Sequence, residues 1–322
     1  FDDAATSLIT KGRPPRDVPM KIFPAVHYSM GGLWADYARS ADGGLLAGDP
    51  SNHMTDIPGL YAIGECDYHY HGANRLGANS LLSCIFTGLF TGPSITSYVN
   101  GQSEGHADLS STTVDAAMQA QMKRHDDLLN RTAGGEPENP YLIHQQLGDV
   151  MTRAATVVRR NDQLQDALST VHDLHERAGR VSLSDSGTWT NQNVIFAKSL
   201  QDMFPLAKCI LKGALQRDEC RGAHFKPDFQ KHSLTAEDPA QRRRQAEEWC
   251  DEFQANNEKY LKSTVATWKD DTAMPEINYE DVDTSLIPPR PRLYGLVGAE
   301  EIEEVWNERI KSKEQQPEPV GA

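Results

Sequence analysis

Apolar residues recur three and four positions apart through much of the chain after residue 100. This is the spacing of one face of an α-helix. The pattern predicts helices over residues 113–129, 140–159, 163–177 and 192–217. The second of these has the clearest start, because Asn139 can cap a helix and Pro140 suits its first position. We therefore expect a helical bundle here, and no catalytic cluster is apparent within it.

The chain changes character again beyond residue 225. A charged segment contains the run Arg242 to Arg244, which is more typical of a solvated helix face than of a binding patch. Residues 260–268 are rich in β-branched side chains, which predicts a strand. We expect a charged helix over residues 299–311 and a disordered tail over residues 314–322.

Ahead of the bundle, the short apolar run of residues 60–63 ends at Gly64-Glu65. Such a run predicts a buried strand that stops at the glycine, with a carboxylate at its tip. A carboxylate in this position can accept hydrogen bonds from a ribose. Residues 21–26 are also strand-like and place His27 at their end. A hairpin is expected around the turn at residues 42–44.

A further helix signal begins at Asn79-Ser80, which can form an N-cap. Apolar residues follow on a wide helical face and predict a buried helix: Leu81, Leu82, Ile85, Phe86, Leu89 and Phe90. The free N–H groups and the positive dipole end at its start favour an anionic ligand or an electron-rich ring. Arg75 precedes this helix in a glycine-bearing loop, where a guanidinium can bind a carboxylate bidentately.

Charge and cysteine usage narrow the function classes. The chain has 322 residues and a formal net charge of −14, which argues against nucleic acid or an anionic membrane surface as a direct partner. The five cysteines include no Cys-x-x-Cys pair, so neither a zinc site nor an iron–sulfur cluster is expected. The most apolar stretch, residues 81–90, is too short to span a bilayer. Any membrane attachment is therefore expected to come through another subunit.

Three motifs give the chain a family resemblance. His71 to Leu82 reads His-Gly-Ala-Asn-Arg-Leu-Gly-Ala-Asn-Ser-Leu-Leu, and Pro24 to Gly32 contains His-Tyr-Ser-Met-Gly-Gly. Arg217 to His224 reads Arg-Asp-Glu-Cys-Arg-Gly-Ala-His. In this order the motifs resemble those of the flavoprotein subunit of succinate dehydrogenase and fumarate reductase, with Cys220 where the family pattern has serine.

The resemblance implies a fold class of α/β plus α. The chain would be the C-terminal portion of a longer flavoprotein, because no Gly-x-Gly-x-x-Gly fingerprint follows a strand in it. The implied order is the tail of a capping domain, the C-terminal part of a Rossmann-like FAD-binding domain, a helical bundle, and a mixed C-terminal region with a disordered tail. These parts correspond to residues 1–20, 21–100, 101–225 and 226–322.

The resemblance also implies site residues. The substrate dicarboxylate would be bound by His27 and Arg75, although by residue type alone a lone histidine or a loop arginine is more often structural. FAD would be contacted by Glu65, Asn79, Ser80, Leu81 and Tyr28. No catalytic residue is expected in this chain, since the family's proton-transferring arginine would lie upstream. The third motif would either order a junction and the surface for an iron–sulfur subunit, or be a purely structural ion-pair network.

The implied reaction is oxidation of succinate to fumarate, or its reverse, by hydride transfer to or from FAD. This chain alone is expected to be inactive. Electrons would pass to an iron–sulfur subunit and then, through a cytochrome b or membrane-anchor subunit, to quinone. The protein would lie peripherally on the cytoplasmic face of the membrane. The alternatives are a soluble enzyme resembling L-aspartate oxidase and a non-enzymatic half-flavoprotein that serves as an interaction module.

Overall fold

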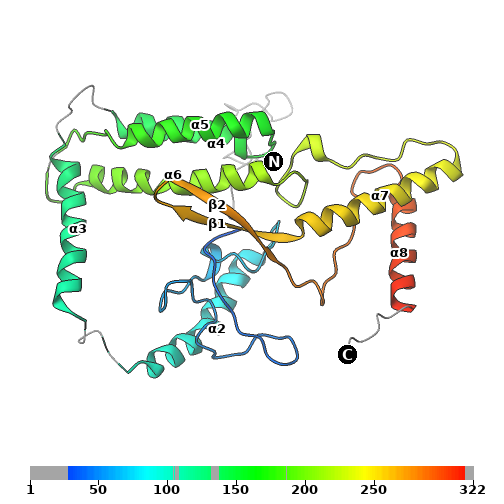
Figure 1. Ribbon diagram of the computed structural model, residues 1–322, viewed down its shortest axis with the longest axis horizontal. Helices are drawn as coiled ribbons and strands as arrows, with labels where there is room; N and C mark the ends of the chain where they lie inside the picture. The colour runs from blue at the N-terminus through cyan, green and yellow to red at the C-terminus, as the bar shows by residue number, and fades with distance from the viewer. Residues whose placement is uncertain (1–27, 104, 106–108, 132–137, 186, 316–322) are drawn as a thin grey trace, which may run out of the picture. The chain divides into compact units, whose positions relative to one another are not determined.

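The computed structural model describes residues 28–103, 105, 109–131, 138–185 and 187–315. The chain divides into two compact units, residues 1–101 and 102–322, and each is described by itself. Helices dominate the described residues, which contain one two-stranded antiparallel sheet (Figure 1). The helical part of the predicted fold class is therefore confirmed, whereas these residues form no Rossmann-type parallel sheet. None of the described helices has the length and hydropathy needed to cross a bilayer.

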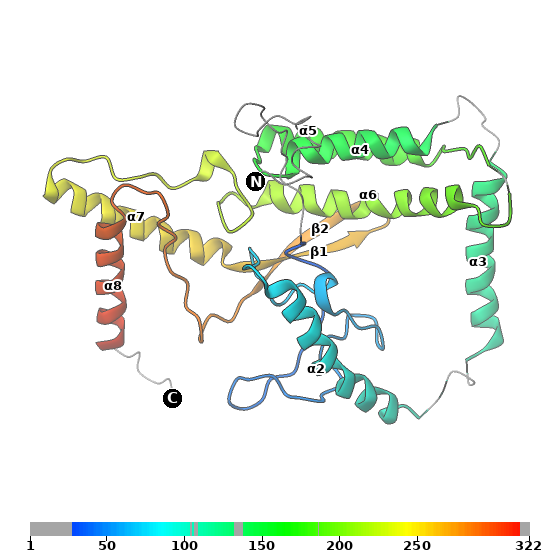
Figure 2. The same cartoon turned by 180° about the vertical axis from the view of Figure 1, so that it is seen from behind.

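The first unit is built from turns around one long helix. This helix is α2, Asn79–Gly101, and the short 3-10 helix η1, Gly64–Cys66, precedes it (Figure 2). The turn at residues 42–44 is closed by a single antiparallel bridge between Arg39 and Leu45. The predicted hairpin is therefore reduced to one bridge.

Residues 60–63 do not form the predicted strand. Tyr61 makes one isolated antiparallel bridge to Met54, and Ala62 is the only buried residue of the run. The Ala62 N–H bonds to the carbonyl of His53, which lies in a turn. An extended run becomes a strand only when a neighbouring strand pairs its backbone groups. No such strand lies beside this run among the described residues.

The helix α2 begins at Asn79 as predicted, but its buried face is not the apolar one. The buried residues carry hydroxyl groups and recur at helical spacing: Ser83, Thr87, Thr91 and Ser94. Most of the apolar side chains are exposed, with Leu81 at 73% and Leu89 at 75%. The prediction of a buried apolar face is therefore wrong for this structure. The reason is that the loops beside α2 present polar groups, which pair with its hydroxyls.

The four helices predicted for the bundle are all present in the second unit. They are α3, Ser111–Leu129; α4, Pro140–Ala155; α5, Asn161–Ala178; and α6, Gln192–Gln216. α4, α5 and α6 pack together (green in Figure 1) around one apolar core that includes Ile143, Leu164, Val171, Phe204 and Leu211. The predicted cap is confirmed, because Asn139 Oδ1 accepts a hydrogen bond from the Tyr141 N–H at 2.9 Å. α3 contributes little to this core, since Leu128 is its buried residue.

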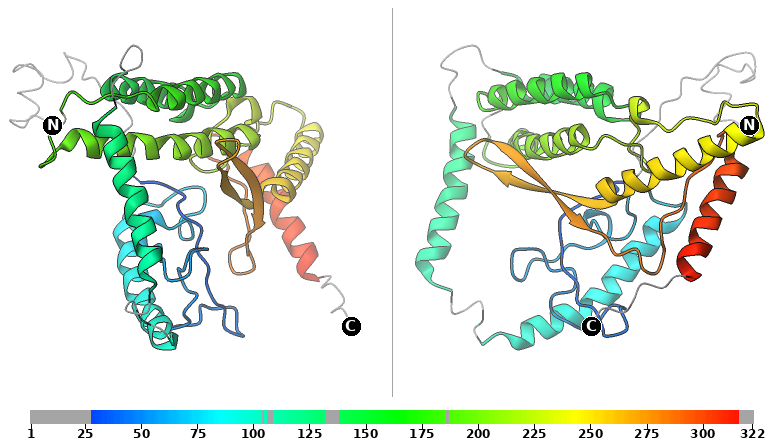
Figure 3. Two further views of the ribbon diagram at one scale, coloured as in Figure 1. Left: turned by 60° about the vertical axis from the view of Figure 1, so that its left-hand side comes forward. Right: turned by 45° about the vertical axis from the view of Figure 1, so that its right-hand side comes forward.

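The C-terminal region contains the sheet and two more long helices. The strands β1, Lys262–Lys269, and β2, Met274–Asp281, pair antiparallel and confirm the predicted strand to within two residues. α7, Pro239–Tyr260, packs against α8, Ala299–Gln315 (yellow and red in Figure 3), which confirms the predicted charged helix. The short 3-10 helix η3 is Pro227–Phe229.

The arginine run lies on α7. Arg242 forms an ion pair with Glu301, and Arg243 forms one with Glu308, so two of its members bind α8. The predicted tail overlaps the end of α8 at residues 314–315 and otherwise lies outside the described residues.

Candidate functional site

The hydroxyl face of α2 fixes the loop that carries Glu65. Thr87 Oγ1 accepts a hydrogen bond from the Gly64 N–H at 3.0 Å and donates to the Ser83 carbonyl at 2.8 Å. Gly64 has φ of 69°, and a Cβ there would lie 3.1 Å from Cys84 Sγ. The position requires glycine, because a side chain would meet both backbone strain and α2. Glu65 therefore follows a backbone position that α2 determines.

Glu65, the predicted ribose acceptor, is exposed and links two of the sequence motifs. Its Oε1 accepts a hydrogen bond from the Ser29 N–H at 3.0 Å, and Ser29 belongs to the His-Tyr-Ser-Met-Gly-Gly motif. A Cβ on Gly32 would lie 2.2 Å from the Cys66 carbonyl oxygen. The second glycine of that motif thus permits a close approach to the chain itself. The structure brings the two motifs together at Glu65.

Arg75, Tyr28 and His71 form a cluster against Ser83 of α2. The Tyr28 hydroxyl lies 3.3 Å and His71 Nε2 lies 3.1 Å from Ser83 Oγ, and the two rings meet edge to face with centroids 5.0 Å apart. The Arg75 guanidinium carbon lies 5.3 Å from the centroid of the Tyr28 ring. Arg75 Nη1 donates to the Leu76 carbonyl at 3.1 Å. This cluster orders the loop just before α2.

One polar atom of this cluster is left without a partner. Arg75 Nε is buried and makes no hydrogen bond within the described residues. A buried N–H of a cation that lacks an acceptor costs free energy, so it marks a position suited to an acceptor from a ligand. The first turn of α2 holds no acidic side chain that would repel such a group.

These donors and acceptors fit the parts of a flavin nucleotide. The exposed Glu65 carboxylate is an acceptor for hydroxyl groups, as on a ribose. The start of α2 offers N–H groups that no earlier turn of the helix can satisfy. Arg75 supplies a cation with an unused N–H. The chemistry of the set therefore suits a ligand that carries ribose hydroxyls and an electron-rich ring, together with a second, carboxylate-bearing ligand at Arg75.

The remaining predicted residues lie where α2 begins. Asn79 and Ser80 are half-buried in its first turn, and the Leu81 side chain is 73% exposed, so its backbone is the part available to a ligand. Tyr28 is buried against Ser83, and His27 lies outside the described residues. The sequence alone assigned no role to His71, although it is the first residue of the arginine motif. Its contact with Ser83 depends on the fold.

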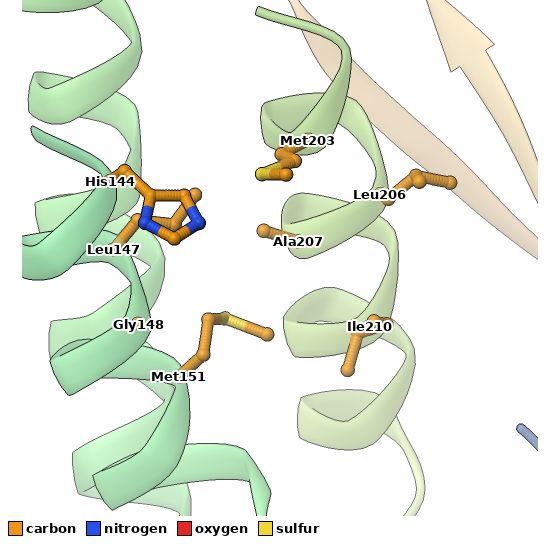
Figure 4. A pocket seen from close by; sticks show the side chains of 8 residues that line it. All are labelled: His144, Leu147, Gly148, Met151, Met203, Leu206, Ala207 and Ile210. Atoms are coloured by element: carbon orange, nitrogen blue, oxygen red, sulfur yellow. The ribbon is translucent and has the colours of Figure 1, made fainter. Parts of the chain in front are cut away.

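An apolar groove between α4 and α6 in the second unit has a volume of about 220 Å³. Figure 4 shows Met151 of α4 and Met203 of α6 on facing sides of it, with the ring of His144 nearby. The lining holds no arginine or lysine, and His144 is its one polar side chain, so the groove lacks the cations that bind a dicarboxylate.

The third motif forms a buried ion-pair network. Glu219 is 1% exposed and accepts from Arg217 Nη1 at 2.6 Å and from Arg221 Nε at 3.0 Å. Arg217 also donates to the carbonyls of Tyr260 and Lys262, which joins the end of α6 to the junction of α7 and β1. The structural interpretation of this motif is thus observed, and a contact with an iron–sulfur subunit stays a prediction.

His224 of the same motif is held neutral. Its Nε2 lies 2.8 Å from the Arg217 carbonyl oxygen, and Nδ1 lies 2.7 Å from Arg159 Nη1, so Nε2–H donates while Nδ1 accepts. Burial, with the neighbouring cations, lowers the pKa of His224 from 6.5 to about 4.

Comparison with known families agrees with these motifs. Residues 144–294 match the sequence model described as fumarate reductase flavoprotein C-term, and residues 3–81 match the model described as FAD binding domain. The succinate dehydrogenase flavoprotein subunit of Bacillus subtilis (strain 168) is 41% identical over 283 residues, which cover 88% of this chain and 42% of that protein. The fumarate reductase flavoprotein subunit of Escherichia coli (strain K12) is 29% identical, with coverage of 88% and 40%.

Solved structures show the same relationship. A structure of an E. coli quinol fumarate reductase FrdA variant is 25% identical, with a TM-score of 0.67 and coverage of 90% of this chain and 43% of that one. The apo Sdh1 complex of Mycobacterium smegmatis is 25% identical, with a TM-score of 0.55 and coverage of 81% and 38%. The chain spans less than half the length of these relatives. The chain belongs to the FAD-binding family of succinate dehydrogenase and fumarate reductase flavoprotein subunits.

Proposed function

We propose that this chain is part of a flavoprotein subunit that interconverts succinate and fumarate. The observation that carries the proposal is Arg75, a half-buried cation beside the start of α2 whose buried Nε–H has no partner among the described residues. Its guanidinium lies over the Tyr28 ring, a contact that holds the group in place without neutralising its charge. A dicarboxylate supplies both the negative charge and the acceptor oxygens that this arrangement lacks.

The chain's own residues bind and orient the ligands in this proposal. Arg75 binds one substrate carboxylate, and His27 hydrogen-bonds the dicarboxylate as well. Glu65 accepts hydrogen bonds from the ribose of FAD, and the flavin contacts Tyr28 and the backbone of residues 79–81. FAD, when bound, accepts or returns a hydride. We assign no proton-transferring residue to this chain.

The proposal includes a route for electrons. They pass from the flavin to an iron–sulfur subunit and then to quinone through a cytochrome b or membrane-anchor subunit, with the flavoprotein peripheral on the cytoplasmic face of the membrane. Support comes from similar solved structures, which are named as a quinol-fumarate reductase with menaquinol molecules and as Sdh1 in complex with UQ1.

The test is made on the native protein that carries this chain. Flavin absorbance is recorded under anaerobic conditions before and after addition of succinate, with aspartate as the control. Bleaching by succinate and not by aspartate is expected. Bleaching by aspartate would move the assignment to an enzyme like L-aspartate oxidase. The absence of flavin from the native protein would favour the half-flavoprotein interaction module.

A matched pair of variants tests Arg75 itself. Arg75 and Arg39 each lie 5.3 Å from the centroid of a tyrosine ring, Tyr28 and Tyr37 respectively, and Arg39 is exposed. Loss of a charged hydrogen-bonding partner costs about 1.5–3 kcal/mol, so Arg75→Met should raise the KM for succinate at least about tenfold. Arg39→Met should leave it unchanged. Equal KM values in the two variants, with flavin still reducible by dithionite, would remove Arg75 from the substrate site.

A further inference from the structure

Three side chains in the first unit, two of them from the segment between Glu65 and Arg75, lie close together. One imidazole nitrogen of His53, one of His69 and a carboxylate oxygen of Asp67 all lie within 4.8 Å of one another. His53 Nε2 is 3.4 Å from Asp67 Oδ2, and His69 Nδ1 is 2.6 Å from Asp67 Oδ1. Three potential ligands therefore face a common point.

This cluster is largely withdrawn from solvent. The side chains of Asp67, His53 and His69 are 0%, 2% and 13% exposed. Asp67 Oδ2 finds no hydrogen-bond partner among the described residues, and neither does His69 Nε2. A carboxylate withdrawn from water needs full pairing or a metal ion to offset its lost hydration. The unpartnered oxygen faces the His53 ring, at the point where the three ligand atoms converge.

The outer contacts of the cluster also suit a metal site. His53 Nδ1 lies 2.9 Å from Thr91 Oγ1, which is buried on α2. Histidine ligands commonly donate their second ring N–H to an oxygen in this way, which fixes the tautomer and the ring. The His53 backbone is left-handed, with φ of 63°, so the chain accepts strain to place this ring. The Tyr70 hydroxyl lies 2.5 Å from His53 Nε2, the ring nitrogen that also faces Asp67, and is a fourth polar group at the cluster.

We propose that His53 Nε2, His69 Nδ1 and the Asp67 carboxylate bind a divalent transition-metal ion of the zinc class. Two imidazoles and one carboxylate are typical ligands of such an ion. They do not suit Mg²⁺ or Ca²⁺, which favour oxygen ligands alone. Tetrahedral ligands about 2.1 Å from an ion lie about 3.4 Å apart, which is the His53 to Asp67 distance already present. On binding, the His69 imidazole takes the tautomer with its proton on Nε2, which frees Nδ1 for the ion, and the contact between His69 and Asp67 opens by less than about 1 Å.

The bound ion would act as a structural clamp. Asp67 and His69 lie between Glu65 and Arg75 in sequence, whereas His53 comes from an earlier turn and is tied to α2 through Thr91. The ion would hold these segments together. Sequence spacing gave no signal for this site, because His53 precedes Asp67 by 14 positions and the three residues match no common metal motif.

The experiment is a Zn²⁺ titration of the native protein after treatment with a chelator. Calorimetry measures affinity and stoichiometry, and Co²⁺ is added in parallel because its visible absorption bands report tetrahedral coordination. We expect one Zn²⁺ per chain and a Co²⁺ spectrum that Zn²⁺ abolishes. His53→Gln and Asp67→Asn should each weaken Zn²⁺ binding at least about 100-fold, and Thr91→Val about 10- to 100-fold. Circular dichroism confirms that each variant is folded.

The matched control is His172→Gln. His172 lies 3.6 Å from Glu176 on α5 and is 44% exposed, so it offers an imidazole and a carboxylate without a third ligand or burial. This variant should bind Zn²⁺ like the unaltered protein. The proposal is overturned if the unaltered protein binds no stoichiometric Zn²⁺, or if the His53→Gln and Thr91→Val variants bind Zn²⁺ as tightly as the unaltered protein does. If both ligand variants fail to fold, Thr91→Val still decides, because it keeps all three ligands.

Discussion

Replacement of Thr87 by valine tests whether the hydroxyl face of α2 positions the loop that carries Glu65. Thr87 is 0% exposed, and its Oγ1 accepts the Gly64 N–H at 3.0 Å. Valine has nearly the same shape but no oxygen. The substitution therefore removes an acceptor without opening a cavity, and it leaves a buried N–H on Gly64 with nothing to bind.

The size of the effect follows from burial. Water cannot reach the Gly64 amide to replace the lost acceptor, because both Gly64 and Thr87 are buried. A buried donor left unsatisfied costs about 1–3 kcal/mol. This corresponds to about a 5- to 150-fold rise in the population of the locally open loop.

Hydrogen exchange of the Gly64 amide measures this population directly, because exchange requires opening of the loop. Thr87→Val should speed exchange of that amide by the same factor, and Thr87→Ser, which keeps the hydroxyl, should restore protection. Thr96→Val is the matched control, since exposed Thr96 lies on the same helix and, among the described residues, its hydroxyl donates to the Gly92 carbonyl of α2 itself. If the Gly64 amide exchanges at the same rate in Thr87→Val and in Thr96→Val, the Thr87 hydroxyl does not hold the loop.

Two further predictions concern the third motif. Glu219→Gln leaves Arg217 without its buried counter-charge and should lower the free energy of unfolding by about 3–5 kcal/mol, which thermal melting detects. Glu308→Gln, at an exposed ion pair, should change the free energy of unfolding little. Equal melting temperatures for the two variants would contradict a stabilising role for Glu219. The pKa of His224 is lowered from 6.5 to about 4 in the folded chain, so the unfolded chain binds the proton more readily. The contribution of neutral His224 to the free energy of unfolding should therefore be complete above pH 6.5. It should fall toward pH 4 by at most about 1.4 kcal/mol per pH unit. Denaturant titrations at several pH values measure this fall, and His224→Gln should flatten it.

The helices were predictable because their signals are local. Asn139 and Pro140 specify the start of α4 within a few residues, and the apolar spacing specifies the core-facing side of α4. Residues 60–63 show the opposite case. A strand depends on a partner from elsewhere in the chain, and composition alone does not reveal whether that partner is present.

The candidate site divides in the same way. Its residue identities could be predicted from the sequence, since Glu65 and Arg75 belong to short, contiguous motifs. Their environment could not. The contact of His71 with Ser83 and the hydrogen bond from Ser29 to Glu65 each join residues that are distant in the sequence. The lack of a partner for Arg75 Nε among the described residues depends on burial, which the sequence does not show.

By itself the sequence determined the family, the order of helices and the positions of the motif residues, because each rests on residue types at short, fixed spacing. Only the tertiary structure decided which face of α2 is buried. The apolar stripe predicted one face, but the hydrogen bonds that join Gly64 to Thr87 and His53 to Thr91 select the other. The physical reason is that a buried backbone or imidazole group must find a partner, and the partner's position depends on the whole fold.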